Sequence, residues 1–128
     1  MTFRLGQGAA GSTYGRVRVE NSSAAACTLH GYGGLSHVGH GNGTQIGAAA
    51  DREPARVRTV TLQPGEVARA RVRMVEAGNY PRRACRPRRV DGFRVYLPGE
   101  TRSAYVAFRT TGCADPAVHL LSSRPYRG

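Results

Sequence analysis

The segment "EVARARVRMV", residues 66–75, carries the clearest secondary-structure signal in this chain. From residue 68 to residue 74 every second residue is an arginine, and the residues between are small or apolar. The arginines are Arg69, Arg71 and Arg73, and the opposite side holds Ala68, Ala70, Val72 and Met74. A period of two is that of a β-strand with one face on a core and the other in solvent. The stretch therefore predicts a half-buried strand.

Neighbouring segments repeat this pattern. "YGRVRVEN", residues 14–21, sets Arg16 and Arg18 opposite Val17 and Val19. "DGFRVYL" (91–97) and "SAYVAFR" (103–109) flank a Pro-Gly turn and predict a hairpin. Gln63-Pro64-Gly65-Glu66 has the type II turn signature and separates residues 66–75 from "ARVRTVTL", residues 55–62. The core candidates of that last segment are Val57, Val60 and Leu62.

Weaker signals complete the prediction. Residues 117–122 can form a last strand, and only single helical turns fit, at 73–78 or 81–85. Short strands separated by turns every eight to twelve residues indicate an all-β, antiparallel, immunoglobulin-like β-sandwich. The length, 128 residues, suits one domain over residues 1–128. We expect loose ends at about 1–12 and 123–128.

Two of the three cysteines suit a disulfide. Cys85 precedes the 91–97 strand and Cys113 follows the 103–109 strand, so the open end of that hairpin brings them together. Two unrelated buried thiols are the alternative. A bridge would indicate an oxidising compartment.

Cys27 is the odd cysteine. As a nucleophile it would need a base held against it, and the nearest candidate is His30. On a strand, residues three apart point to opposite faces, so this pair does not favour catalysis.

The segment "HGYGGLSHVGHGNG", residues 30–43, concentrates histidine and glycine. Its glycines match neither a P-loop nor a dinucleotide-binding loop, because no lysine and no helix follow. A zinc site would need a further ligand, and no carboxylate lies between Glu20 and Asp51. Since 41–43 is a hairpin-turn signal, we expect His37 and His40 near a hairpin end in solvent. We expect no cofactor and no metal.

The net charge is +11, and all 19 basic residues are arginine. Arginine binds phosphate and carboxylate through a planar fork, which suits a polyanionic partner. Codon bias in a GC-rich genome is an alternative reason for the missing lysine. No apolar run approaches the ~20 residues that a membrane span needs. Residues 2–6 do not resemble a signal peptide, so an exported protein would have its signal segment outside this chain.

The arginine clusters are the strongest functional candidates. One group alternates along two predicted strands and the other crowds the segment around Cys85, and the alternative is that both are merely solvated. The candidate anion-binding residues are Arg16, Arg18, Arg69, Arg71, Arg73, Arg82, Arg83, Arg86, Arg88 and Arg89.

Several segments together resemble a known family. They are "GAAGSTYGRVRVENSS", "CTLHGYGGLSHV", "VTLQPGEVARARV", "NYPRRACRP", "DGFRVYLPGET" and a late "GC", spanning about residues 3–122. They resemble the actinobacterial domain of unknown function 4232, found mostly in secreted proteins and lipoproteins. The resemblance implies an exported immunoglobulin-like sandwich without assigned catalytic residues. It also implies a cysteine before "FRL" that pairs with the one in "CTL"; here Met1-Thr2 stands instead, which leaves Cys27 unpaired.

These observations favour a non-enzymatic, exported or cell-envelope-associated binding module. Its partner would be an anionic wall polymer, acidic lipid headgroups or an acidic protein. A cytoplasmic nucleic-acid-binding protein is the alternative. The third class is a hydrolase built on Cys27 or on a histidine-bound metal.

Overall fold

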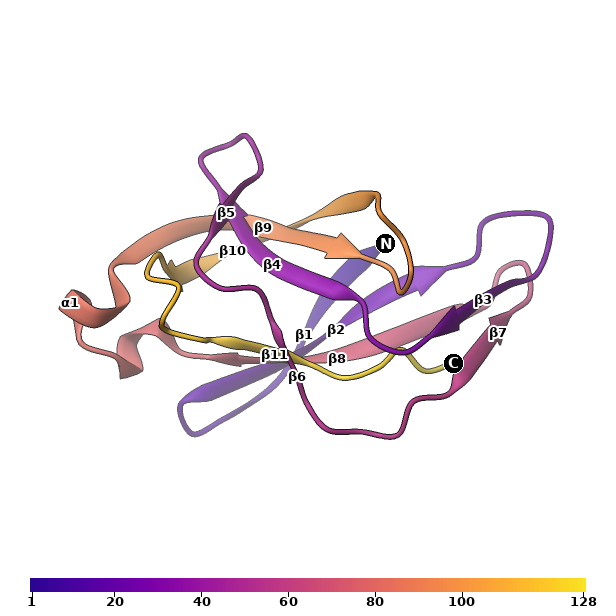
Figure 1. Cartoon of the computed structure of the whole chain (residues 1–128), viewed down its shortest axis with the longest axis horizontal. Coiled ribbons are helices and arrows are strands. Elements are labelled where there is room, and N and C mark those ends of the chain that lie inside the picture. Colours follow the sequence, from indigo (N-terminus) through magenta and orange to yellow (C-terminus); the bar gives the residue numbers. More distant parts are fainter.

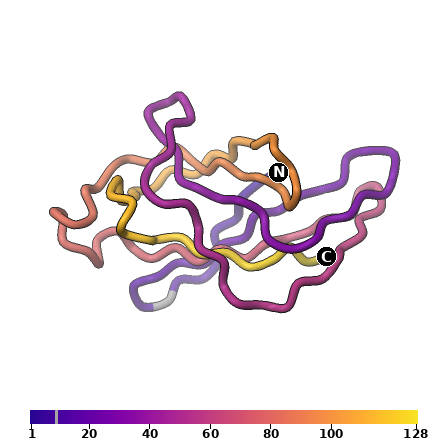
Figure 2. The backbone as a smooth tube through the Cα atoms, in the orientation of Figure 1, coloured from indigo at the N-terminus to yellow at the C-terminus, as the bar shows by residue number. Residues whose placement is uncertain are grey.

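The computed structural model describes residues 1–8 and 10–128. The chain is nearly all β, and its path is drawn in Figures 1 and 2. The strands are β1 (Thr2–Ala9), β2 (Ser12–Glu20), β3 (Cys27–His30), β4 (Gly34–Gly39), β5 (Thr44–Ile46), β6 (Asp51–Arg52), β7 (Thr59–Leu62), β8 (Val67–Val75), β9 (Pro87–Tyr96), β10 (Ser103–Cys113) and β11 (Leu121–Ser123). Two helical turns, η1 (Ala77–Asn79) and α1 (Arg82–Cys85), follow β8.

The strands form three sheets. The first has the order β1-β2-β8-β11-β6, the second β10-β9-β4-β5, and β3 pairs with β7 in a third. All pairs are antiparallel except the short parallel pair of β11 with β6. In Figure 1, α1 lies at one end of the molecule and the β3–β7 pair at the other. The predicted all-β fold with antiparallel sheets is confirmed.

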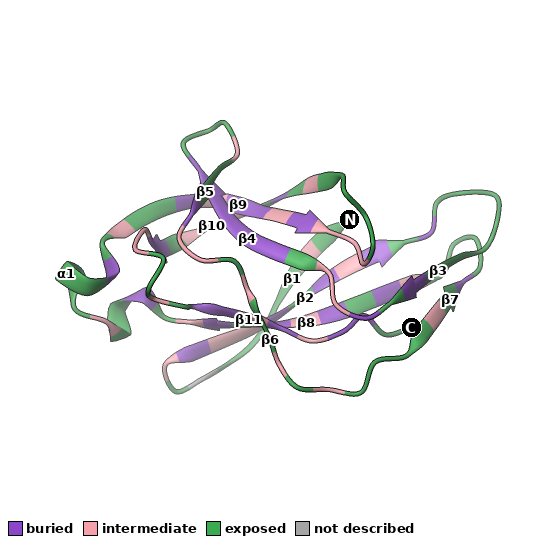
Figure 3. Ribbon diagram, viewed as in Figure 1, coloured by how far each residue is buried: buried purple, intermediate pink, exposed green. Residues whose placement is uncertain are grey.

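The alternation in residues 66–75 has the predicted consequence. Ala68, Val72 and Met74 of β8 are buried, while Arg69 and Arg73 are exposed. β8 pairs with β2 over nine residue pairs, from Ser12 opposite Val75 to Glu20 opposite Val67. The apolar faces of both strands therefore point to the same side. Figure 3 colours the ribbon of both strands by the burial of each residue.

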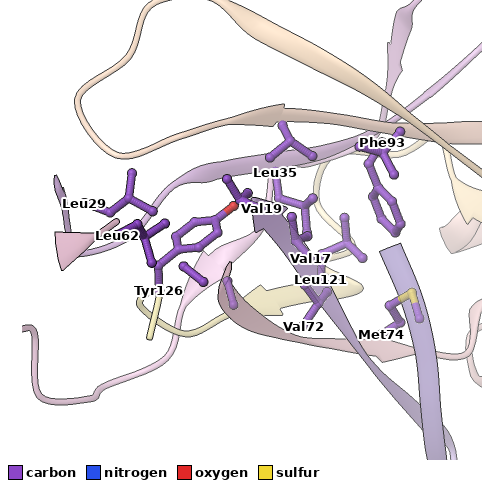
Figure 4. Close-up of a cluster of buried hydrophobic side chains, with 14 residues drawn as sticks. Val17, Val19, Leu29, Leu35, Leu62, Val72, Met74, Phe93, Leu121 and Tyr126 are labelled. Carbon is purple, nitrogen blue, oxygen red and sulfur yellow. The ribbon is translucent and has the colours of Figure 1, made fainter. Parts of the chain in front are cut away.

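The first and second sheets share one core. Val17, Val72 and Leu121 of the first sheet belong to the same buried cluster as Phe93 and Val95 of the second. The cluster is drawn in Figure 4. Phe93 is fully buried, and its ring lies 4.8 Å from that of Phe3 and 5.5 Å from that of Phe108. Contacts between aromatic rings of this kind stabilise the fold by more than the burial of their apolar area alone.

The prediction of loose ends is wrong on both sides. Residues 2–9 form strand β1, because Phe3 carries apolar surface that packs against the core opposite Val17. At the other end, Tyr126 is only 3% exposed and its N–H donates to the carbonyl of Gly31. Figure 4 shows its ring beside Leu62. An aromatic ring near a terminus anchors that terminus when the core has room for it.

Smaller differences follow from local context. Val57 is 37% exposed, because β7 begins only at Thr59. Residues 73–75 continue β8, so the helical turn falls at Arg82–Cys85, the second of the two expected places. The last strand is shorter than predicted and lies at Leu121–Ser123.

Cys85 and Cys113 form the predicted disulfide. Cys113 lies opposite Pro87 at the open end of the β9–β10 hairpin, and α1 brings Cys85 to the same end. Both are buried in a second small cluster with Ala77 and Leu120. The bridge thus ties the α1 turn to the sheet.

We expect a variant with Cys85→Ala and Cys113→Ala to lose about 3.5 kcal/mol of unfolding free energy, because the open loop regains chain entropy when unfolded. The bridge closes a sequence separation of 28 residues. Urea unfolding under non-reducing conditions measures the loss. Cys27→Ser, which removes the free and exposed cysteine, is the matched control and should leave the midpoint unchanged. Equal midpoints for the double variant and the control would contradict the prediction.

Candidate anion-binding surface

Arginines from three adjacent strands lie in rows across the outer face of the first sheet. Arg4 of β1 is opposite Arg16 of β2, and Arg16 is opposite Arg71 of β8. In the next row, Arg18 is opposite Arg69. Strand alternation sets all these side chains on the face away from the core. We call this set, with Arg73, the arginine ladder: Arg4, Arg16, Arg18, Arg69, Arg71 and Arg73.

The ladder sets like charges directly opposite one another. Residues in register on neighbouring strands have Cβ atoms about 4.5–5.5 Å apart, and like charges there are destabilising. The two ion pairs of the described residues, His119 with Asp51 and Arg124 with Glu53, lie outside the ladder. Glu20, at the end of β2, is the carboxylate that shares the ladder's face on these strands. The ladder therefore carries an excess of positive charge that the chain leaves uncompensated.

Tyr14 orders one of the ladder's side chains. The guanidinium of Arg71 lies over the Tyr14 ring, 4.3 Å from its centroid. A cation–π contact of this kind is worth about 0.5–1 kcal/mol at an exposed site. It holds the planar fork of Arg71 in one orientation, which reduces the entropy lost when the fork binds an anion.

The ladder lines an open groove of about 820 Å³. Arg4, Leu5 and Gln7 of β1 form one wall, and side chains of β2 and β8 form the rest. Its lining contains five arginines, which are Arg4, Arg16, Arg18, Arg69 and Arg71, and no carboxylate. The groove is thus chemically suited to phosphate or carboxylate oxygens.

Two arginines of this basic face are not among the sequence-based candidates. Residues 1–12 are expected to be loose, yet the alternation of Phe3 and Arg4 is the same signal as in β2. Residues 123–128 are expected to be loose as well, whereas the backbone of Arg127 pairs with that of Arg69. The contact between Tyr14 and Arg71 depends on register, which the sequence alone does not give.

The remaining predicted arginines lie elsewhere. Arg82 and Arg83 belong to α1, and Arg86 ends it in the left-handed conformation, with φ at 55°. Arg88 and Arg89 begin β9, which belongs to the second sheet. All five side chains are exposed. The ten predicted arginines thus form two separate groups, five in the ladder and five around α1.

The expectation that His37 lies in solvent is wrong. His37 is 4% exposed and stacks on Phe93 with ring centroids 5.3 Å apart, and its Nε2 has no hydrogen-bond partner. Alternation along β4 puts it on the same face as Leu35, which is the core face. Burial lowers the pKa of His37 to about 4. His40, by contrast, is exposed as expected.

Among the described residues, the structure brings together no group of side chains that would fit the cysteine–histidine hypothesis or the metal hypothesis. Cys27 is free and exposed, and the Nδ1 atom of His30 lies 2.9 Å from the hydroxyl of Thr59. In the part of the chain that the structure describes, no three His, Cys, Asp or Glu side chains are placed to hold a metal ion. Over the same residues, no helix is long and apolar enough to cross a membrane.

The fold and this surface define an all-β domain with a strongly basic face on one sheet. The chain belongs to the family described as Domain of unknown function (DUF4232), whose model matches residues 1–126. The sequence resemblance to that family is confirmed over nearly the whole chain. No curated protein and no solved structure matches it.

We expect the burial of His37 to make the protein less stable in acid. Its pKa is about 4 when folded and 6.5 ordinarily, so protonation favours the unfolded chain. The stabilisation is complete above pH 6.5 and is lost as the pH falls from there toward 4. Between pH 7 and pH 5 this amounts to about 2 kcal/mol.

Urea unfolding of the protein and of His37→Leu at both pH values measures this contribution. The variant should lose about 2 kcal/mol less than the wild type between pH 7 and pH 5. His40→Asn, at an exposed position of the same hairpin, should keep the wild-type dependence. Identical pH dependence in His37→Leu and wild type would show that His37 is not the group responsible.

Proposed function

We propose that this domain is a non-enzymatic, immunoglobulin-like sandwich module that is exported or held in the cell envelope and binds an anionic partner through the arginine ladder. The observation that carries the proposal is the register of Arg4, Arg16 and Arg71 across three strands, with no carboxylate lining their groove. An anion bridging these rows would replace repulsion with charge-assisted hydrogen bonds.

The compartment is inferred from the disulfide. Cys85 and Cys113 are joined, and structural disulfides persist in oxidising environments. The bridge is compatible with an extracytoplasmic location. Binding without catalysis is supported by the lining of the groove, which offers arginines and no Asp, Glu, His or Cys side chain to act as a general acid, a general base or a nucleophile.

The test is a paired substitution that interrupts both rows. Arg16→Thr with Arg69→Thr leaves the stacked Arg71 in place, and threonine suits a strand. We expect the affinity for long-chain inorganic polyphosphate to fall by about tenfold or more, because each charged hydrogen bond is worth about 1.5–3 kcal/mol. The slope of log affinity against log salt should become shallower by about two.

The control removes the same charge elsewhere. Arg102→Thr with Arg109→Thr changes two exposed arginines, one at the turn after β9 and one on β10. General attraction to a basic protein would make the two variants lose equal affinity. That outcome would reduce the ladder to a solvated face and refute the proposed function.

The same ladder variant should be at least as stable as the wild type. Removing Arg16 and Arg69 relieves like-charge pairs without removing buried surface, so the thermal midpoint in low salt should stay constant or rise. Differential scanning calorimetry measures it. A clear fall of the midpoint would mean that these arginines support the fold, and would contradict their assignment to binding.

A further inference from the structure

A second groove adjoins the ladder. It has a volume of about 390 Å³ and is lined by Arg56, Arg58 and Arg127 together with Thr59, Val60, Tyr126 and Gly128. The segment that supplies Arg56 and Arg58 leads into β7, at the end of the molecule opposite α1 (Figure 1). Among the described residues that line this groove there is no Asp or Glu side chain.

Arg127 joins the two grooves. Its N–H donates to the carbonyl of Arg69 at 2.8 Å, and the N–H of Arg69 donates to the carbonyl of Arg127 at 2.7 Å. A reciprocal pair of this kind places both side chains on the same face of the sheet. The preceding Tyr126 points the other way, into the core. One row therefore runs from Arg18 through Arg69 to Arg127 and continues at Arg56 and Arg58.

Two carboxylates near this row are engaged away from it. Glu53 pairs with Arg124, which is itself half-buried beside the carbonyl of Arg71. The side chain of Glu66 accepts from the N–H of Gln63 in the turn before β8. Glu20 shares the face of the row at the end of β2, two residues beyond Arg18, so five arginines there stand against one carboxylate.

From this continuity we infer that the ligand is a linear, phosphodiester-linked polymer without nucleobases, lying across the strands from the ladder into the second groove. The inference rests on the proposed function and specifies its ligand. From Arg18 on β2 across β8 to Arg127 the row extends about 10 Å, since adjacent strands lie about 4.8 Å apart. That is longer than one phosphate group, and the second groove extends it further.

The aromatic groups of the two grooves argue against nucleobases. Binding of single-stranded nucleic acid uses open aromatic faces on which bases stack. The Tyr14 ring is covered by the guanidinium of Arg71, and Tyr126 is buried. A polymer whose repeating unit is a phosphate and a small alcohol has no base to stack, so the arginine charges are enough to bind it. A row of charges along two neighbouring grooves also suits a linear polymer better than the flat surface of a bilayer.

The probe is a set of synthetic glycerol phosphate oligomers of increasing length, with binding measured by calorimetry. The affinity per oligomer molecule should rise with oligomer length until the oligomer spans both grooves. Longer oligomers should then bind with the same affinity. In Arg56→Thr with Arg58→Thr, affinity for the long oligomers should fall by about tenfold, while the shortest oligomer should lose less than about threefold. Arg102→Thr with Arg109→Thr is again the charge-matched control.

The outcomes separate the inference from the proposed function. One outcome is that Arg16→Thr with Arg69→Thr lowers the affinity for the oligomers, while Arg56→Thr with Arg58→Thr lowers it no more than the control does. That outcome would overturn the extended track and leave the ladder in place. No loss beyond control in either variant would overturn both. Tighter binding of single-stranded DNA of equal charge, or binding to phosphatidylglycerol vesicles without binding to oligomers, would overturn the choice of ligand.

Discussion

The pairing of β2 with β8 determines both the buried and the exposed face of the first sheet. Nine residue pairs fix the register of two strands that both alternate between arginine and apolar residues. Because side chains along a strand have a period of two, a slip of one residue would turn every arginine of one strand toward the core. The same register that buries Val17 beside Ala70 therefore also stacks Arg16 beside Arg71. The register of this one strand pair therefore determines which side chains form the core and which form the ladder.

This register carries an electrostatic cost that the apolar face offsets. The buried faces of β2 and β8 belong to the main core, with Val17 and Val72 almost completely inaccessible. Burying such side chains contributes about 1.5–3 kcal/mol each, whereas cross-strand pairs on a sheet change stability by about 0.2–1 kcal/mol each. The sheet therefore tolerates the ladder in the absence of a ligand. The stability of the fold does not explain why the ladder is there.

The sequence predicts those features that depend on local periodicity. The strand alternation of β2 and β8 and the hairpin of β9 and β10 follow from neighbours along the chain, and the Cys85–Cys113 bridge follows from the open end of that hairpin. The missed features depend on contacts between distant segments. His37 is buried because β9 and Gly112 of β10 cover it, and Tyr126 is ordered because the core beside Leu62 receives its ring. The sequence of a short, polar-rich segment does not indicate whether distant strands will cover its side chains.

The buried ring of Tyr126 determines where the next residue, Arg127, lies. Its ring packs into the core, and its N–H donates to Gly31, so the C-terminal segment is held along the edge of β8. The next residue, Arg127, is thereby placed against Arg69 on the outer face. Without the buried ring, this segment would have only a few exposed hydrogen bonds, and its arginine would belong to a mobile tail. The continuity of the basic surface is thus a consequence of core packing, and a charge count along the sequence cannot distinguish it from a frayed, positively charged end.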